Sequence, residues 1–324
     1  MQRVLSGIQP SGELHLGNYL GAIRNWIELQ ETYEAFYCVV DLHAITIRQD
    51  PEHLRQNIRA LARFYLAFGL NPKKSTVFVQ SHVPAHATLG WMLSTITKIT
   101  ELERMTQFKD KSSQHGENIN AGLLTYPALM AADILLYHPQ LVPVGEDQQQ
   151  HIELTRTIAE RFNKRFGEIF ILPQAYIPKQ GARIMGLDNP ARKMSASAPT
   201  PFNYISLLDD APSVEKKIKR AVTDSGTEIC AGKDKPALTN LLTIMSLLTN
   251  SPIAELEKQY AGKSYGTFKQ DLVQIINAFL QPIRERYHAI SDRELDAMLH
   301  DGAQRANAIA EKTLTIALSA MGLR

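Results

Sequence analysis

The 324-residue sequence is poor in cysteine and carries little net charge. Its two cysteines, Cys38 and Cys230, lie far apart, and neither belongs to a Cys-x-x-Cys pair. This pattern disfavours a disulfide framework and a cysteine-based zinc site, and it fits a reducing compartment. The 35 basic and 33 acidic residues leave a formal net charge of +2. That balance argues against non-specific coating of nucleic acid, although a local basic face is still compatible with it.

Long hydrophobic segments are absent as well. The most apolar stretch, residues 121–137, contains Pro127 and Asp133 and is short for a membrane span. The sequence begins with strand-like residues rather than with the apolar region of a signal peptide. Apolar residues make up 44% and charged residues 21%, which is near the globular average. We therefore expect a globular, cytoplasmic protein without a membrane segment.

The first part of the chain alternates short apolar strands with helical periodicity, which predicts an α/β fold with a doubly wound parallel sheet. The run at 35–42 is almost continuously apolar, as in a strand that is buried on both faces. The expected strands are 3–8, 35–42, 75–80 and 141–144. The expected helices of this part are about 15–33, 50–69, 85–105, 121–137 and 147–163.

Beyond Pro201 the pattern becomes purely helical, and the Ser-, Ala- and Pro-rich stretch 195–203 marks the expected boundary. The sequence thus predicts a second, all-helical domain. Its expected helices are about 213–223, 236–248, 252–260 and 267–290, followed by a last helix at 303–321.

The first strand-to-helix junction, 9–18 (QPSGELHLGN), carries polar groups suited to a nucleotide. Open parallel sheets bind ligands at such junctions. His15 and Asn18 share one face of a helix start, and Gly17 lets a base or ribose approach the backbone. Simple capping of the helix explains the same residues. No G-x-G-x-x-G follows this strand, and no strand precedes the Gly-Lys-Ser at 262–264, so NAD enzymes and P-loop NTPases are disfavoured.

Three further segments carry candidate chemistry. In 192–197 (RKMSAS) a lysine and two hydroxyls suit a polyphosphate, although a solvated linker has the same composition. In 144–151 (VGEDQQQH) the acids suit ribose hydroxyls or an ammonium group, or they cap a helix. Asp133 lies in an apolar helix and needs a hydrogen-bond donor, which a ligand or a structural salt bridge would supply.

In this order the segments resemble class I aminoacyl-tRNA synthetases, and within them the bacterial enzymes specific for tryptophan. The tetrapeptide 15–18 (HLGN) is similar to the "HIGH" element of that class, and 193–197 (KMSAS) to its "KMSKS" loop. Ala196 departs from the second lysine of that loop, and Leu5 departs from an aromatic residue that is common there. Further similar segments are 7–22, 101–111, 130–137, 142–163 and 216–225.

The resemblance implies a Rossmann-like catalytic domain for ATP and tryptophan at 1–200 and a helical anticodon-binding domain at 201–292. A C-terminal segment, 293–324, would pack back on the catalytic domain. The implied reaction activates L-tryptophan with ATP to tryptophanyl-adenylate and pyrophosphate, and then transfers tryptophan to the 3′ end of tRNA(Trp). The implied enzyme is a homodimer whose Mg2+ is carried by ATP, with no metal site made by protein side chains.

The resemblance also assigns roles to individual residues. Its catalytic residues are His15, Asn18, Lys111 and Lys193. Its ATP-binding residues are Gln9, Pro10, Ser11, Gly17, Asn18, Gly145, Glu146, Asp147, Ile184, Lys193, Met194, Ser195, Ala196 and Ser197. Its tryptophan-binding residues are Leu5, Val40, His43, Gln107, Tyr126, Met130, Asp133, Val144 and Gln148. A basic face for tRNA is expected on the helix that carries Lys216, Lys217, Lys219 and Arg220.

Two alternatives stay open at this point. A tyrosyl-type synthetase would share the fold but would need a partner for a phenol rather than for an indole. A non-aminoacylating regulatory paralogue would bind RNA or an amino acid without catalysis, and Ala196 is the feature that favours it.

Overall fold

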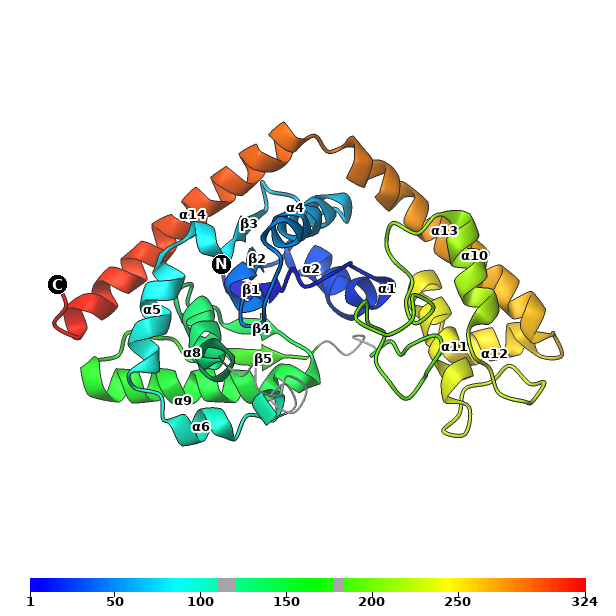
Figure 1. Cartoon of the computed structure of the whole chain (residues 1–324), viewed down its shortest axis with the longest axis horizontal. Helices are drawn as coiled ribbons and strands as arrows, with labels where there is room; N and C mark the ends of the chain where they lie inside the picture. The colour runs from blue at the N-terminus through cyan, green and yellow to red at the C-terminus, as the bar shows by residue number, and fades with distance from the viewer. Residues whose placement is uncertain (110–119, 178–182) are drawn as a thin grey trace. The chain divides into compact units, whose positions relative to one another are not determined.

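The computed structural model describes residues 1–109, 120–177 and 183–324, which form two compact units (Figure 1). The expected catalytic domain, 1–200, contributes residues to both units, and the functional division into domains stays a prediction. Unit 1 consists of Met1–Ser11, Trp26–Lys179 and Ser291–Arg324. Unit 2 consists of Gly12–Asn25 and Gln180–Ile290.

Unit 1 is built on a five-stranded parallel sheet with the order β3-β2-β1-β4-β5, which confirms the predicted fold class. The last strand was not predicted, because its three residues, Gln-Ala-Tyr, form no apolar run. The strands are β1 (Arg3–Ile8), β2 (Glu34–Val39), β3 (Ser75–Val79), β4 (Leu141–Pro143) and β5 (Gln174–Tyr176).

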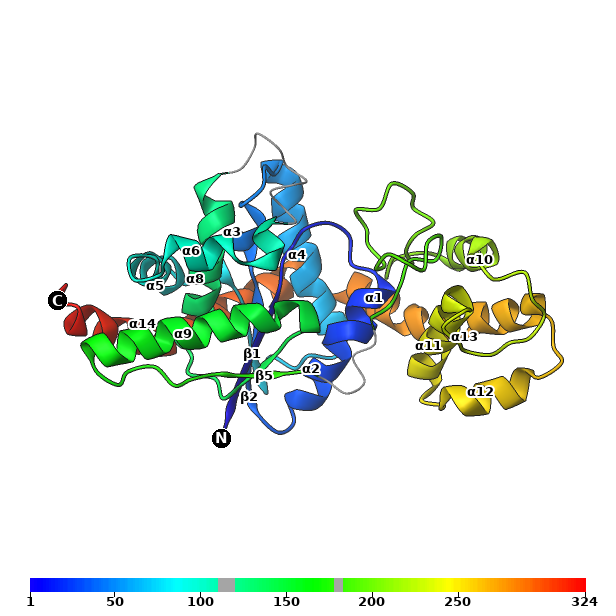
Figure 2. The ribbon, with the colours of Figure 1, turned by 90° about the horizontal axis from the view of Figure 1, so that it is seen from below.

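Helices cover both faces of this sheet, as the near-continuous apolar strands require. On one face Leu5, Phe36 and Phe78 belong to a core that includes residues of α5, α8 and α9. Figure 2 shows α9 lying across the strands on this side. On the other face Tyr37 stacks on Trp26 with ring centroids 4.8 Å apart. The helices of unit 1 described so far are α5 (Ala85–Ser94), α8 (Ala121–Leu135) and α9 (Gln149–Phe166).

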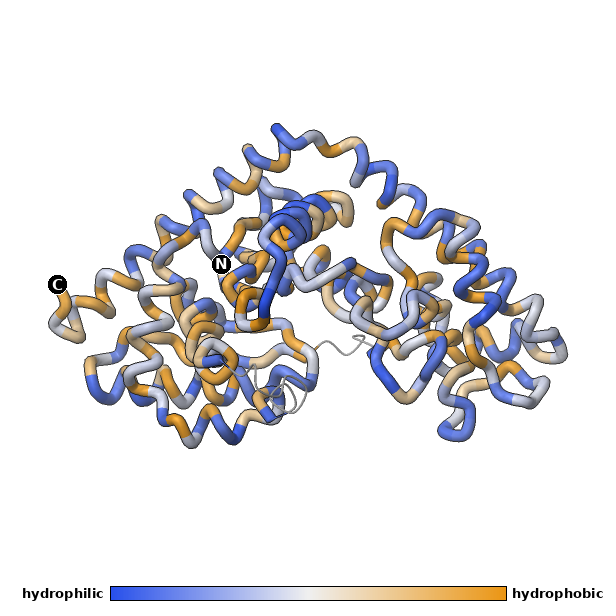
Figure 3. The backbone as a smooth tube through the Cα atoms, viewed as in Figure 1, coloured by the Kyte–Doolittle hydropathy of each residue, from blue (hydrophilic) through white to orange (hydrophobic). Residues whose placement is uncertain are grey.

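Helix α14 (Asp292–Ala320) packs against the edge strand β3. Hydrophobic and hydrophilic positions alternate along it, as expected of a helix with one buried face (Figure 3). A Cβ placed on Gly302 would lie 1.7 Å from the carbonyl oxygen of Val77, so only glycine permits this approach. Nη2 of Arg305 donates to the carbonyl oxygens of Pro72 and Ser75. The helix therefore covers an edge that would otherwise expose unpaired backbone groups.

The remaining elements of unit 1 are short, apart from α4. The expected helix 85–105 is interrupted after α5, because Thr95, Ile96 and Thr97 are β-branched and disfavour helix. The expected helix 303–321 begins earlier, at Asp292, where the Ser291 side chain caps it. These elements are α3 (Asp41–Ala44), α4 (Pro51–Ala67), η2 (Gln80–His82), α6 (Ile99–Glu103) and η4 (Glu146–Gln148).

The described part of unit 2 contains helices and no strand. The expected helix 15–33 is divided into three parts by a π-helical turn, and its last part, α2 (Arg24–Leu29), continues into unit 1. Among the described residues, no helix combines the length and apolarity needed to cross a membrane. The elements of unit 2 are α1 (Leu16–Asn18), η1 (Tyr19–Ile23), α10 (Ala211–Arg220), α11 (Pro236–Thr249), α12 (Ile253–Tyr260) and α13 (Tyr265–Ala289).

We predict that Gly302→Ala destabilises the protein by about 1–3 kcal/mol, because the added methyl group overlaps the Val77 carbonyl and forces α14 away from β3. Urea denaturation followed by circular dichroism measures the change. Gly266→Ala in α13 is the control, since its Cβ would meet nothing closer than the Ser264 hydroxyl at 3.5 Å. Equal stability of the two variants would contradict the predicted close packing.

Candidate functional site

The centre of the candidate site in unit 1 is the carboxylate of Asp133, on α8. The residue is 5% exposed. His43 donates from Nε2 to Oδ2 over 2.7 Å, while His86 and Gln80 donate from Nδ1 and Nε2 to Oδ1 over 2.7 and 2.6 Å. The donors come from α3, α5 and η2, so they reach Asp133 from elements that follow β2 and β3. The structure thus satisfies a buried charge with three side chains.

These donors fix the ionisation state of the carboxyl group. Burial by itself raises the pKa of Asp133, but the hydrogen bonds and charges of His43 and His86 outweigh it and hold the pKa well below its usual range. Asp133 is therefore a carboxylate at neutral pH and can only accept hydrogen bonds.

Gln80 and His86 were not predicted as site residues. Residue 80 was expected at the end of a strand, whereas β3 ends at Val79 and Gln80 opens η2. A polar residue directly after a buried parallel strand is a signal for a ligand-binding edge, and it identifies Gln80 in retrospect. His86 lies inside α5 and is 1% exposed, and no pattern in the sequence singles it out.

A second network of polar side chains in unit 1 joins several residues predicted to bind ATP or tryptophan. The Tyr126 hydroxyl donates to Oε1 of Gln107 and also pairs with Nε2 of His151. Nε2 of Gln107 lies 3.3 Å from Oδ2 of Asp147, and Nε2 of Gln148 lies 3.0 Å from the same oxygen. The structure thus brings two amides to one exposed carboxylate, and one of these amides also accepts from the phenol.

The two networks are neighbours, because the rings of His43 and Tyr126 meet edge to face with centroids 6.1 Å apart. Nε2 of Gln9 donates to the carbonyl oxygen of His43 over 3.0 Å, which ties the end of the first strand to the same place. The other predicted residues here differ in exposure. Val40, Met130 and Val144 are half-buried against the core, Leu5 and Pro10 are buried, and Ser11, Gly145 and Glu146 are exposed.

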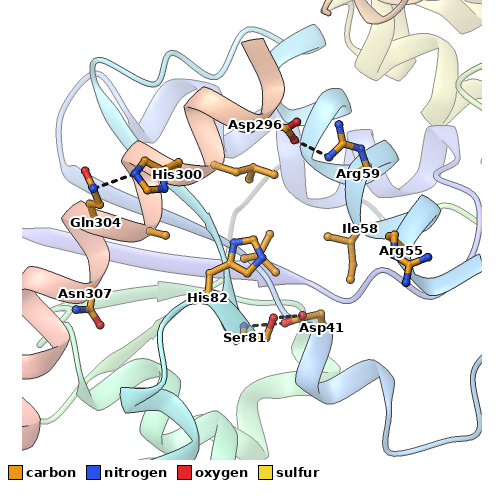
Figure 4. A pocket seen from close by; sticks show the side chains of 13 residues that line it. Asp41, Arg55, Ile58, Arg59, Ser81, His82, Asp296, His300, Gln304 and Asn307 are labelled. Carbon is orange, nitrogen blue, oxygen red and sulfur yellow. Dashed lines mark hydrogen bonds and ion pairs between the residues drawn. The ribbon is translucent and has the colours of Figure 1, made fainter. Parts of the chain in front are cut away.

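A pocket of about 630 Å³ lies beside η2 and is shown in Figure 4. Asp41 lines it and accepts hydrogen bonds from the backbone N–H and the hydroxyl of Ser81. Arg59 and His300 point into the same region, and Arg59 pairs with Asp296 of α14. The contact between Asp41 and Ser81 fixes η2, and with it the backbone of Gln80 next to Asp133.

In unit 2 the candidate nucleotide segment is held by backbone pairing with residues 205–207. The N–H of Leu16 donates to Ile205, and the N–H of Leu207 donates to Leu14. The Asn18 side chain accepts from the N–H of His15 over 2.9 Å, so the two predicted residues cap the helix start together. The structure thus agrees with the interpretation that these residues cap the helix. The amide nitrogen of Asn18 is left for another partner.

His15 is 6% exposed, and its Nδ1 has no hydrogen-bond partner within the described ranges. Burial, with a smaller contribution from the charge of Lys193, lowers the pKa of His15 to about 4. The imidazole is therefore neutral at physiological pH. A Cβ at Gly17 would crowd this imidazole, because it would lie 3.1 Å from Nδ1 of His15 and 3.4 Å from the sulfur of Met194.

Hydrogen bonds within unit 2 hold the backbone at the start of segment 193–197. Met194 donates its N–H to the carbonyl oxygen of Ile184, and both side chains are buried. The N–H of Ser195 donates to Oδ1 of Asn203, a contact that sequence reasoning missed. Lys193 and Ser197 are exposed, and Ala196 is half-buried. Among the residues that the structure describes, Lys193 has no ion pair, so its ammonium group is free to meet a ligand.

Three further expectations concern single sites. Lys111 lies outside the described residues. Lys217 was wrongly expected on an exposed basic face, because its ammonium group is buried and lies 2.6 Å from Oδ2 of Asp209. The described ranges contain no group of three His, Cys, Asp or Glu side chains that could hold a metal ion.

We predict that Lys193→Met raises the pKa of His15 above its wild-type value of about 4, because the variant removes the charge that opposes protonation while burial persists. A titration of the histidine ring resonances by NMR measures this pKa. Lys258→Met, in α12, serves as the control and leaves the titration unchanged. An unchanged His15 pKa in Lys193→Met would show that the lysine does not act on the imidazole.

Comparisons with known proteins agree on one family. The family model for class I tRNA synthetases (W and Y) matches residues 1–281. A tryptophan–tRNA ligase from Halalkalibacterium halodurans is 57% identical and covers 99% of this chain and 97% of its own length. The structure of tryptophanyl-tRNA synthetase from Mycoplasma pneumoniae superposes with a TM-score of 0.93 and 42% identity, covering 100% of this chain and 98% of that one.

The tryptophanyl-tRNA synthetase from Campylobacter jejuni, solved in complex with ADP and tryptophan, has a TM-score of 0.85 and 38% identity. It covers 99% of this chain and 100% of its own. Similarity of this extent spans both compact units as well as the candidate residues. The chain therefore belongs to the class I tRNA synthetases of the tryptophan and tyrosine (W and Y) family.

Proposed function

We propose that this protein is a tryptophan–tRNA ligase, which activates L-tryptophan with ATP and transfers it to the 3′ end of tRNA(Trp). Relatives named for this activity support the proposal, because they are 52–57% identical over nearly the whole chain. The observation that carries the choice of amino acid is the buried, ionised carboxylate of Asp133. An indole N–H satisfies such an acceptor, phenylalanine has no donor for it, and tyrosine places its hydroxyl elsewhere.

In this proposal the indole ring of tryptophan lies against the half-buried apolar side chains near Asp133. Val40, Met130 and Val144 would form the walls, and His43 would lie beside the ring with Leu5 behind it in the core. The amino and carboxylate groups of tryptophan would be held by the polar network of Tyr126, Gln107 and Gln148. This division follows the chemistry of the groups. The side chains proposed for the indole ring are apolar, whereas those proposed for the amino and carboxylate groups are polar.

The residues proposed to bind ATP are Gln9, Pro10, Ser11, Gly17, Asn18, Gly145, Glu146, Asp147, Ile184 and residues 193–197. Exposed acids suit ribose hydroxyls, and the exposed Lys193 suits phosphate. The Ile184 and Met194 side chains are buried, so in this structure neither side chain is available to a nucleotide.

The activation step needs no nucleophile from the enzyme. A carboxylate oxygen of tryptophan attacks the α-phosphorus in line, the bond from that phosphorus to the bridging oxygen breaks, and pyrophosphate leaves. Lys193, with Lys111, would stabilise the charge that develops on the phosphates, while neutral His15 and Asn18 would donate hydrogen bonds. A hydroxyl of the terminal tRNA ribose, the 2′ one by analogy with the class, then attacks the acyl carbon, and AMP leaves.

Mg2+ would accompany ATP rather than occupy a protein cage. Mg2+ commonly binds through substrate phosphates and water, which supports this proposal. When bound, the ion neutralises phosphate charge.

The tRNA would meet the exposed basic residues of α10, which are Lys216, Lys219 and Arg220. The guanidinium of Arg220 lies 3.9 Å from the centre of the Phe202 ring, which preorganises it for a phosphate. Lys217 is excluded from this face by its ion pair with Asp209.

We further propose that the enzyme acts as a cytoplasmic homodimer. Trp91 on α5 and Ile99 on α6 are 74% and 63% exposed, which is unusual for large apolar side chains that lie near each other in the sequence. A second copy of the chain would cover them.

The proposed function predicts that Asp133→Ala lowers kcat/KM for tryptophan by about 100-fold or more, because the indole N–H loses a charged acceptor. Activity with phenylalanine should fall little or rise, because that substrate has no N–H to place. Exchange of labelled pyrophosphate into ATP measures both activities. Asp301→Ala, on the exposed side of α14, is the matched control for removal of a carboxylate.

Two results would speak against the proposal. Wild-type protein without tryptophan-dependent exchange would exclude the ligase activity. A folded Asp133→Ala variant that loses both substrates by the same factor would show that the carboxylate is structural and that the assignment to tryptophan is wrong.

A second prediction concerns Lys193→Ala, which should slow adenylate formation by at least about 100-fold, the scale of removing one donor that stabilises transition-state charge. Tryptophan binding should change much less, because the lysine acts on phosphate. Single-turnover adenylation and equilibrium dialysis of tryptophan separate the two effects. Arg192→Ala, at the exposed preceding residue, is the control, and near-normal adenylation by Lys193→Ala would refute the role.

A further inference from the structure

The two oxygens of the Asp133 carboxylate have unequal numbers of hydrogen-bond donors. A carboxylate offers about four acceptor positions, two on each oxygen. Within the described residues, Oδ1 receives two donors, Nε2 of Gln80 and Nδ1 of His86, whereas Oδ2 receives one, Nε2 of His43. Oδ1 is therefore saturated, and one acceptor position is left on Oδ2.

The two donors to Oδ1 are also less exposed than the donor to Oδ2. Gln80 is 0% exposed and the side chain of His86 is 1% exposed, so no ligand can approach Oδ1 past them. The side chain of His43 is 11% exposed, and its ring meets that of Tyr126 edge to face. The open acceptor position thus belongs to the oxygen whose neighbours still reach the surface.

The orientation of Gln80 is fixed on both sides of its amide. Oε1 accepts the backbone N–H of Leu42 over 3.0 Å, so Nε2 must face Asp133. The backbone of η2 is held in turn by Asp41, which accepts the N–H and the hydroxyl of Ser81 (Figure 4). The Gln80 amide cannot turn without breaking one of these contacts.

The tautomer of His86 follows from its two partners. Because the ionised carboxylate only accepts, Nδ1 of His86 carries the proton that faces Asp133. Nε2 pairs with the Tyr137 hydroxyl over 2.8 Å, and burial raises the pKa of that phenol, so it keeps its proton. The ring of His86 is thereby held with its Nδ1 donor directed at Asp133.

We propose that Gln80 and His86 are positioning residues, which occupy both acceptor positions of Oδ1 and leave Oδ2 of Asp133 as the sole acceptor for the indole N–H of the substrate. This inference rests on the proposed function. Neither residue touches the substrate. They determine specificity by setting the rotation of the carboxylate, so that its open position lies on the oxygen that faces His43.

The test compares variants that differ in one donor. In His86→Asn the amide nitrogen takes the place of Nδ1 and keeps the donor, whereas His86→Leu removes it, and Gln80→Met removes the other donor at similar volume. The substrates are tryptophan and its benzothienyl isostere, in which sulfur replaces the indole N–H. Their kcat/KM values are measured by pyrophosphate exchange, and thermal midpoints report folding.

We expect His86→Leu and Gln80→Met to lower kcat/KM for tryptophan by about tenfold, the scale of one hydrogen bond to a charged group. Activity with the isostere should change by less than about twofold. His86→Asn should keep most of the wild-type preference for tryptophan. Equal losses with both substrates, or a loss in His86→Asn as large as in His86→Leu, would overturn the proposal.

The experiment separates this proposal from the function on which it rests. Wild-type exchange that depends on tryptophan supports the function whatever the variants do, and its absence removes both. If His86→Leu does not fold, Tyr137→Phe replaces it, because that change frees Nε2 of His86 and leaves the Nδ1 donor unfixed. Tyr137→Phe should lower the preference for tryptophan over the isostere, and an unchanged preference would contradict the proposed positioning.

Discussion

The burial of one negative charge organises unit 1. Asp133 lies in an apolar helix, where an unpaired carboxylate would cost several kcal/mol. The donors that remove this cost come from α3, η2 and α5, so the ends of β2 and β3 must meet α8 in one arrangement. The parallel sheet supplies that arrangement, because its strands end together at one edge. Three donors for four acceptor positions also leave room for one hydrogen bond from a ligand.

Unit 2 differs from unit 1, because its candidate site combines a neutral buried group with an exposed positive charge. One of its buried titratable groups, His15, is neutral because burial and the charge of Lys193 lower its pKa to about 4. Its cation, Lys193, is exposed and lies at the start of a segment held by backbone contacts to Ile184 and Asn203. A neutral imidazole does not repel that lysine, so the positive charge is available for phosphate. In the proposed function, recognition of the amino acid would use a buried anion, and activation would use an exposed cation.

Features that depend on residues close in sequence could be predicted. The apolar run at 35–42 identified the buried strand β2, which lies between β3 and β1, and the strand and helix alternation identified the parallel sheet. The short strand β5 and the π-helical turn at Tyr19–Ile23 could not be predicted, because neither has a distinctive apolar pattern. The segments that carry His15, Asp133 and Lys193, in that order along the chain, indicated the family, which the comparisons confirmed.

The partners of those residues could not be predicted, because they depend on which distant segments meet. Gln80 lies 53 residues and His86 47 residues before Asp133, and no local pattern relates them. Lys217 was misassigned for the same reason, since only the fold places Asp209 beside it. Sequence therefore identified the charged groups of the candidate site, whereas the structure shows which of their atoms are already engaged.

The central claim is that the Asp133 carboxylate accepts the indole N–H of tryptophan. The most direct measurement is an NMR spectrum of tryptophan labelled with 15N in the indole ring and bound to the protein. The account predicts one indole N–H resonance that is shifted downfield, exchanges slowly with water and returns toward the position of free tryptophan in Asp133→Asn. A bound ligand whose indole N–H keeps its free shift and its rapid exchange in the wild-type protein would contradict the account.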